Sequence, residues 1–203
     1  MSIIDMSKDE EMQKIKRLID SCQKCSLWET RSHAVTGEGS CSADIMFIGE
    51  APGYNEDKQG RPFVGRAGKV LDEMLASVDL DRNDVFIANI LKCRPPNNRN
   101  PRKVEIENCT EYLDRQIEII QPMILVPLGN FACTYIFEKF SISPKKISDV
   151  HGKVFQKTTL LGSLYIIPFF HPAVATYNPS KKTVLIQDMQ KIMDVLNENI
   201  VEI

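Results

Sequence analysis

The chain has 203 residues, which is enough for one compact domain with a substantial core and hardly enough for two. Apolar residues make up 43% and charged residues 26%, an ordinary globular composition that excludes disordered and fibrous proteins. The formal net charge is −2, no apolar run approaches the ~18 residues of a membrane span, and the N-terminal segment lacks the apolar core of a secretion signal. We therefore expect one monomeric domain over residues 1–203, in the cytoplasm or at the nucleoid, without membrane contact.

The predicted elements alternate between helices and short buried strands. In chain order, the pattern predicts a helix over 9–20, a strand over 43–48, a helix over 65–78, a strand over 84–90, a helix over 103–120, a strand over 123–128, a helix over 130–140, a small hairpin near 153–157, a strand over 164–169 and a helix over 180–199. This alternation implies an α/β fold, a three-layer α/β/α sandwich around a mainly parallel sheet of four strands.

Three loops leave the predicted strands at their carboxyl ends, where α/β sheets collect their functional residues. They are residues 49–53, 89–101 and 171–173. Because the carboxyl ends of parallel strands meet at one edge of a sheet, we expect these loops to build a common site.

Positive charge gathers in two stretches beside the first two of these loops. Residues 58–69 and 92–103 together carry nine basic residues and no acidic one. The remaining 16 basic residues and all 27 acidic residues lie elsewhere, where the net charge is therefore −11. A solvated face is the plain alternative for either stretch alone, but two on an acidic chain favour binding to a phosphate backbone.

Four of the six cysteines are candidate metal ligands, since clustered cysteines in a reducing compartment indicate metal, redox or catalytic use. Cys22 and Cys25 form a C-x-x-C at the end of the first helix, and Cys93 and Cys109 lie in a basic loop and the helix after it. Four thiolates suit either zinc or a [4Fe–4S] cluster, and spacing alone leaves both open. The two other cysteines are interpreted as unligated thiols.

Three more side chains stand where chemistry is expected. His171 leaves a buried strand beside a proline, which makes it a candidate catalytic group as well as a structural histidine. Asn89 ends a strand and is either a turn cap or a reader of a base edge. Phe63 would normally belong to the core, but in a cationic glycine-rich loop it is a candidate stacking platform for a base.

Signatures of several common enzyme classes are absent from the sequence. There is no G-x-x-x-x-G-K-[ST], G-x-G-x-x-G, H-E-x-x-H or G-x-S-x-G. This argues against an NTPase, a dinucleotide enzyme, a zinc protease and a serine hydrolase.

Taken together, the loop motifs resemble those of the family 4 uracil-DNA glycosylases. The matching segments are GEAPG at 49–53 with Glu56-Asp57, GRPFVGRAG at 60–68, NILKCRPP at 89–96 and HPA at 171–173. The resemblance runs from about Cys22 to the last helix. It implies the uracil-DNA glycosylase fold and a [4Fe–4S] cluster on Cys22, Cys25, Cys93 and Cys109.

The resemblance also implies a function: hydrolysis of the N-glycosidic bond of uracil in single- or double-stranded DNA, leaving an abasic site. In this interpretation Phe63 stacks on the flipped uracil, the Asn89 amide pairs with its N3–H and O4, and His171 hydrogen-bonds the O2 oxygen as charge develops there. Backbone N–H groups between Gly49 and Gly53 add to this stabilisation. The expected DNA anchors are Arg61, Arg66, Lys69, Arg94 and Arg99.

The sequence departs from the family pattern at several positions. Ala51 stands where the best-known uracil glycosylases carry a water-positioning aspartate, so Glu50, helped by backbone carbonyls, is the candidate for that role. Gly53 replaces the tyrosine that blocks the methyl group of thymine elsewhere, and Glu56 is the candidate to fill that space.

A second departure follows the HPA motif. Relatives often carry an arginine there, whereas this chain offers Val174 or Tyr177 as the side chain that wedges into the DNA stack.

Two other classes of function stay open at this point. One is a module with the same fold that binds uracil or DNA without turnover. The other is a zinc-stabilised nucleotide-binding domain unrelated to repair. The release of free uracil would separate the first from an enzyme, and a visible absorption spectrum would separate zinc from iron and sulfur.

Overall fold

A computed structural model describes residues 7–159 and 162–200 of the chain. Its α-helices are α1 (Lys8–Asp20), α2 (Tyr54–Gln59), α3 (Arg66–Ala76), α4 (Lys103–Ile120), α5 (Gly129–Lys139), α6 (Ile147–Val150) and α7 (Pro179–Ile200), and 3-10 helices span Ser26–Glu29 (η1), Pro96–Asn98 (η2) and Pro172–Thr176 (η3). Its strands are β1 (Glu38–Gly39), β2 (Ile45–Gly49), β3 (Phe86–Asn89), β4 (Ile124–Pro127), β5 (Phe155–Thr159) and β6 (Gly162–Ile166). The expected domain over 1–203 also includes residues 1–6, 160–161 and 201–203, which lie outside the described part.

The six strands form one sheet in the order β1-β3-β2-β4-β6-β5. Strands β3, β2, β4 and β6 are parallel, as predicted, while β1 and β5 pair antiparallel at the two edges. The prediction of four strands therefore included the parallel strands but left out the two antiparallel strands at the edges. The edge strand β1 has only two residues, and β5 (FQKTT) is largely polar, so neither carries the apolar run of a buried strand.

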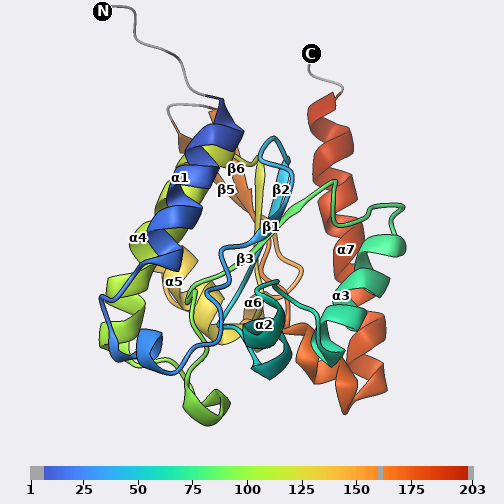
Figure 1. Ribbon diagram of the computed structural model, residues 1–203. Helices are drawn as coiled ribbons and strands as arrows, with labels where there is room; N and C mark the ends of the chain where they lie inside the picture. Colours follow the sequence, from blue (N-terminus) through green and yellow to red (C-terminus); the bar gives the residue numbers. More distant parts are fainter. Residues whose placement is uncertain (1–6, 160–161, 201–203) are drawn as a thin grey trace, which may run out of the picture.

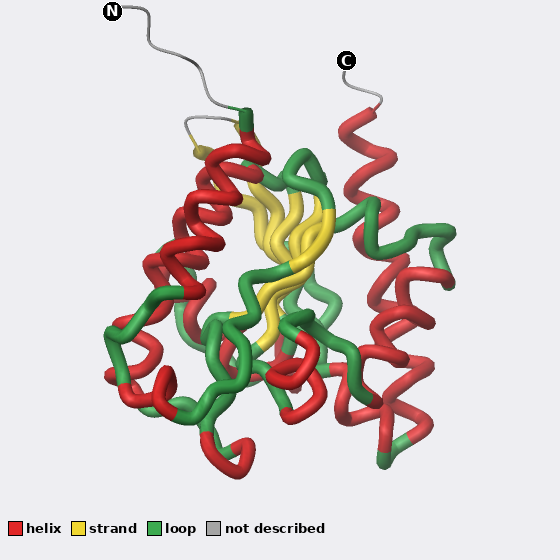
Figure 2. Tube along the Cα trace, viewed as in Figure 1, coloured by secondary structure: helices red, strands yellow, loops and turns green. Residues whose placement is uncertain are grey.

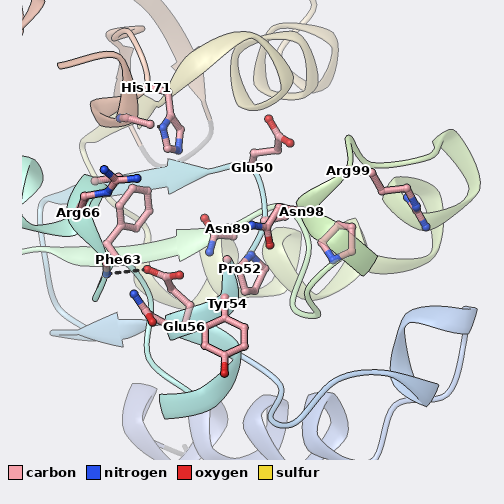
Figure 3. Close-up of a pocket in the computed structure, with 17 residues that line it drawn as sticks. Glu50, Pro52, Tyr54, Glu56, Phe63, Arg66, Asn89, Asn98, Arg99 and His171 are labelled. Atoms are coloured by element: carbon pink, nitrogen blue, oxygen red, sulfur yellow. Dashed lines mark hydrogen bonds between the residues drawn. The ribbon is translucent and has the colours of Figure 1, made fainter. Parts of the chain in front are cut away.

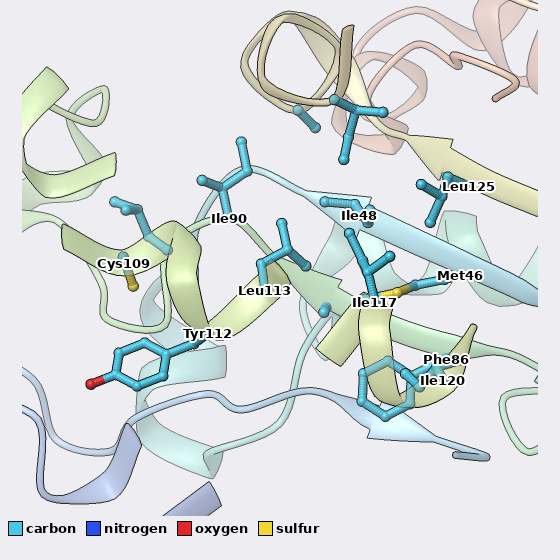
Figure 4. Close-up of a cluster of buried hydrophobic side chains, with 14 of the residues drawn as sticks. Met46, Ile48, Phe86, Ile90, Cys109, Tyr112, Leu113, Ile117, Ile120 and Leu125 are labelled. Atoms are coloured by element: carbon cyan, nitrogen blue, oxygen red, sulfur yellow. The ribbon is translucent and has the colours of Figure 1, made fainter. Parts of the chain in front are cut away.

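Side chains alternate between the two faces of the sheet, and each face has its own helical layer. On β2, Met46 and Ile48 pack on one side and Ile45 and Phe47 on the other. Helices α1, α4 and α5 cover the first face and α3 and α7 the second (Figure 1). Figure 4 shows the first of these clusters, in which α4 lays Leu113 and its neighbours against the strands. The predicted three-layer sandwich is confirmed.

The helices begin and end close to where the sequence predicts them. Helix α1 starts at a reciprocal capping box, in which Ser7 Oγ accepts from the Glu10 N–H and the Glu10 carboxylate accepts from the Ser7 N–H. The short helix α2, by contrast, was not among the predicted elements and directly follows the predicted loop 49–53. Among the described residues, none of the helices has the length and apolar character needed to span a lipid bilayer.

The parallel strands end together and bring the three expected loops to one edge. Gly49 pairs with Asn89 in the β2–β3 register, and Leu128 bridges to Phe169 just before His171. Figure 2 shows the loops and short helices that gather beyond this end of the strands. The sheet topology thus brings Gly49, Asn89 and His171 to one edge, although 40 and 82 positions separate them in the chain.

Candidate functional site

A pocket of about 530 Å³ opens at this edge of the sheet (Figure 3). Its lining includes most of the residues that the sequence indicated for base recognition and catalysis. They are Glu50, Ala51, Gly53, Glu56, Phe63, Asn89 and His171, with Arg66 and Arg99 at the rim. The loops expected to meet therefore do meet around one cavity.

His171 presents a single proton donor to the pocket. Its Nδ1 atom accepts a hydrogen bond of 3.2 Å from the Ala173 N–H, so in the neutral ring the proton is on Nε2. Burial lowers the pKa of His171 to about 4, opposed by the nearby Glu56 carboxylate, so the ring is neutral at pH 7. The site therefore holds a neutral imidazole whose Nε2–H can donate to a ligand.

Phe63 forms a wall of the pocket in a strained backbone conformation. Its φ angle is +51°, its side chain is only 5% exposed, and its ring lies 5.7 Å from that of His171 at an interplanar angle of 27°. A non-glycine residue in the left-handed region costs about 1–3 kcal/mol and persists only where its surroundings hold it. Here Arg82 donates to the carbonyl oxygens of both Pro62 and Phe63 and holds the turn. The ring is thus held as a flat surface beside the imidazole.

Asn89 closes the inner end of the pocket and is 2% exposed. Its backbone carbonyl accepts from the Lys92 ammonium at 2.9 Å, and the same ammonium donates to Gln116 Oε1 at 2.6 Å. Lys92 is itself 1% exposed, and burial lowers its pKa to about 8, opposed by Cys109. The prediction that Lys92 contributes surface charge to the basic stretch 92–103 was therefore wrong. This lysine is buried in the core, where its ammonium supports the end of β3.

Gly49 lies behind Asn89 and Phe63, where a larger residue does not fit. A Cβ atom at this position would overlap Asn89 Oδ1 and lie 2.7 Å from Phe63 Cζ. Substitution Gly49→Ala should therefore displace both side chains and lower activity by about 100-fold or more, since displacements near 1 Å cost this much in catalysis. Steady-state kinetics beside a melting curve checks this, and a folded Gly49→Ala variant with wild-type kcat/KM would contradict the described packing.

The Glu56 carboxylate lies beside Gly53. Its Oε1 atom accepts the N–H groups of Val64 and Gly65, each at 2.9 Å, and its Oε2 atom lies 2.8 Å from where a Gly53 Cβ would be. Glu50 also lines the pocket, and burial raises its pKa. The pocket thus contains two carboxyl groups in different surroundings.

The expected DNA anchors differ in how their charges are used. Arg66 and Lys69 are exposed on the first turn of α3. Arg61, in contrast, makes a two-point pair with Glu38, and Arg99 makes one with the buried Glu105.

Arg94 lies beside an exposed tyrosine, with its guanidinium carbon 5.2 Å from the centre of the Tyr54 ring. The two wedge candidates differ as well. Tyr177 is 76% exposed, while Val174 is packed against the α3–α7 side of the core.

The four candidate metal ligands line one small cavity. Cys22 and Cys25 reach it from the end of α1, Cys93 from the loop after β3, and Cys109 from α4. Arg31 Nη1 donates to Cys93 Sγ at 3.1 Å, and the Lys92 N–H donates to Cys109 Sγ at 3.2 Å.

None of the four forms a disulfide. Within residues 7–159 and 162–200, no group of three or more histidine, cysteine or acidic side chains converges as the ligands of one metal ion.

Sequence reasoning missed two residues of this site. Tyr54 lines the pocket and is exposed, and its place directly after the GEAPG segment in an otherwise polar stretch was the signal for it. Arg82 supports the Phe63 turn from a loop of mixed charges, and nothing in the sequence pattern distinguished it from a surface arginine.

The chain is similar to known proteins over most of its length. A model of the uracil DNA glycosylase superfamily matches residues 36–194. A protein of Sulfurisphaera tokodaii named Type-4 uracil-DNA glycosylase is 48% identical, covering 92% of this chain and 85% of its own length. Proteins of the same name from Saccharolobus solfataricus and Archaeoglobus fulgidus are 44% and 47% identical, covering 97% and 90% of this chain and 88% and 92% of their own lengths.

Proposed function

Because this chain belongs to the uracil DNA glycosylase superfamily, we propose that it excises uracil from DNA by hydrolysing the N-glycosidic bond and leaves an abasic site. The observation that carries the proposal is the convergence of Phe63, Asn89 and His171 on one pocket at the carboxyl edge of the sheet. These three groups supply a stacking surface, a base-reading amide and a proton donor.

Recognition begins when the nucleotide leaves the duplex stack, at a cost of a few kcal/mol that contacts in the pocket offset. The uracil ring lies on Phe63, and the Asn89 amide accepts from N3–H and donates to O4. Cytosine has a bare N3 and an amino group at position 4, so it meets the same amide with both hydrogen bonds mismatched. Leaving buried polar groups unpaired makes this discrimination strong. Glu56, seated over Gly53, occupies the side where the methyl group of thymine would project.

Bond cleavage places negative charge on the departing uracil. His171 donates its Nε2–H to the O2 oxygen as that charge develops, and it does so as a neutral ring because its pKa is depressed. The donor is already oriented by the Ala173 N–H, so little reorganisation accompanies the reaction. Glu50 positions the attacking water, because Ala51 offers no side chain for that purpose.

DNA is held by the cations around the pocket mouth. Arg66, Lys69 and Arg94 bind phosphates, and Arg61 and Arg99 add to this field while also bracing their loops through Glu38 and Glu105. Tyr177, being exposed, is the proposed wedge into the base stack in preference to the packed Val174. The protein works as a monomer on DNA of the cytoplasm and its nucleoid.

The proposal includes a [4Fe–4S] cluster on Cys22, Cys25, Cys93 and Cys109. Their shared cavity and the N–H donors to two of the sulfurs fit thiolate ligands. Such a cluster accepts more varied ligand spacing than structural zinc sites do, which fits a C-x-x-C pair combined with two cysteines 16 positions apart. When bound, the cluster supplies a cross-link between α1, the loop after β3 and α4. Hydrolysis transfers no electron, so its role is structural.

Substitution Cys93→Ala should remove the brown visible absorption and loosen the loop that carries Arg94 and Arg99. Affinity for DNA should fall. The plot of log binding constant against log salt concentration should become less steep by about one or two, because up to two phosphate contacts are lost. Absorption spectra and binding titrations at several salt concentrations check this. Substitution Cys41→Ser, at a cysteine outside the cavity, is the matched control. Unchanged colour and salt slope in Cys93→Ala would contradict the ligand set.

Incubation with a single-uracil oligonucleotide tests whether the reaction is hydrolysis alone. We expect an intact backbone until alkali is added and cleavage at the uracil position afterwards, because strand cleavage by the enzyme itself needs an amine nucleophile. Cleavage without alkali would overturn the monofunctional mechanism.

A further inference from the structure

The pocket continues beyond the three groups assigned to uracil. Figure 3 shows His171 and Phe63 toward one end and Tyr54 toward the other, beyond Glu56. Asn98 also lines the pocket. Flipping removes only one nucleotide from the stack, so the neighbouring nucleotide comes to lie at the mouth of the pocket.

Tyr54 lies at the start of an anchored helix, with its ring open to solvent. It is the first residue of α2 and is 56% exposed. The helix is anchored by the buried Asp57, whose Oδ1 accepts the Ser32 N–H at 2.8 Å and whose carbonyl lies 3.0 Å from His33 Nδ1. These contacts hold the backbone of α2, which carries the Tyr54 ring.

Two cations from separate segments lie over this ring in cation–π contacts. The Arg94 guanidinium carbon lies 5.2 Å from the ring centre and the Lys58 ammonium 5.8 Å. Arg94 is oriented in turn by its Nε–H, which donates to Asn98 Oδ1 at 2.7 Å. An aromatic face beside positioned cations is the arrangement with which proteins bind single-stranded nucleic acid, since every base has a face to stack and a phosphate beside it.

We propose that Tyr54, Arg94 and Lys58 form a subsite for the nucleotide next to the excised uracil. The neighbouring base stacks on the part of the Tyr54 ring that is open to solvent, and the two cations over the ring bind the phosphate that joins this base to the uracil nucleotide. This inference rests on the proposed excision of uracil and adds a contact by which the enzyme holds the strand around the flipped base.

Three single-stranded oligonucleotides, each with one uracil, test the subsite. One is unmodified, one has an abasic spacer on the 5′ side of the uracil, and one has it on the 3′ side. We expect Tyr54→Ala to lower kcat/KM on the unmodified strand about tenfold, mainly through KM, and Tyr54→Phe to retain it. For the wild type, the spacer on the side that occupies the subsite should lower kcat/KM by a similar factor, while the spacer on the other side should not. Tyr54→Ala should be insensitive to the spacer on the subsite side, because the contact is already lost.

The outcomes separate this inference from the proposed function. If Tyr54→Ala is as sensitive to either spacer as the wild type, or if neither spacer affects the wild type, the subsite is wrong while excision stands. If the wild type releases no uracil from the unmodified strand, the proposed function fails first. A melting curve of Tyr54→Ala shows that any loss is not a loss of folding.

Discussion

Replacing His171 by alanine should slow uracil release by about 10²- to 10³-fold and leave affinity for uracil-containing DNA within a few-fold of the wild type. The imidazole donates one hydrogen bond to charge that appears only as the bond breaks, so its removal affects turnover far more than binding. His171→Gln retains a side-chain N–H and should recover part of the rate. Single-turnover kinetics and an equilibrium binding titration measure the two quantities. Equal losses of rate and affinity would make His171 a structural residue.

The depressed pKa of His171 gives the same experiment a pH signature. Because burial holds that pKa at about 4, the ring stays neutral from pH 5 to 8 and its contribution to the rate should be constant there. The unfolded chain binds this proton below about pH 6.5, so folded stability should decline as pH falls from about 6.5 to 4. His171→Ala should flatten that decline. A rate that depends on titration of His171 near pH 6.5 would contradict the neutral-donor role.

Replacing Asn89 by aspartate should lower uracil release by about 100-fold or more and make cytosine release measurable. In the buried pocket a carboxyl group that keeps its proton can donate to the bare N3 of cytosine and accept from its amino group. The change keeps the size of the side chain, so the pocket stays intact. Release of each free base from matched oligonucleotides measures the shift. Asn89→Ala, which offers neither partner, is the control and should release neither base.

Retention of a strict uracil preference by Asn89→Asp would contradict the base-reading role of this residue. In that case the position would be a strand end held by Lys92, and discrimination would have to come from another wall of the pocket.

The fold was largely predictable because its central elements carry strong periodic patterns. The four parallel strands and the long helices bury continuous apolar faces, and parallel topology then brings Gly49, Asn89 and His171 to one edge. The edge strands β1 and β5 carry no such pattern, since one is very short and the other faces solvent with half of its residues. Their pairing depends on neighbours that are distant in sequence.

The details of the site that escaped prediction all depend on tertiary context. Lys92 counts as a surface charge in any sequence window, and only its burial and its hydrogen bonds to Gln116 and to the Asn89 carbonyl reveal it as a support of the site. Arg99 forms an ion pair with Glu105, six positions further along the chain. The positive φ of Phe63 arises because Arg82 holds the turn, and no propensity scale anticipates it. The motifs therefore pointed to residues that line the pocket, while the residues that support them became visible only in three dimensions.

The most direct test of the account is the amount of free base released from otherwise identical oligonucleotides that carry uracil, thymine or cytosine at one position. The account predicts one uracil per uracil-containing strand, in single-stranded and duplex form, and no release of thymine or cytosine. Uracil strands that the protein binds but leaves intact would contradict the account and make the pocket a binding site without turnover.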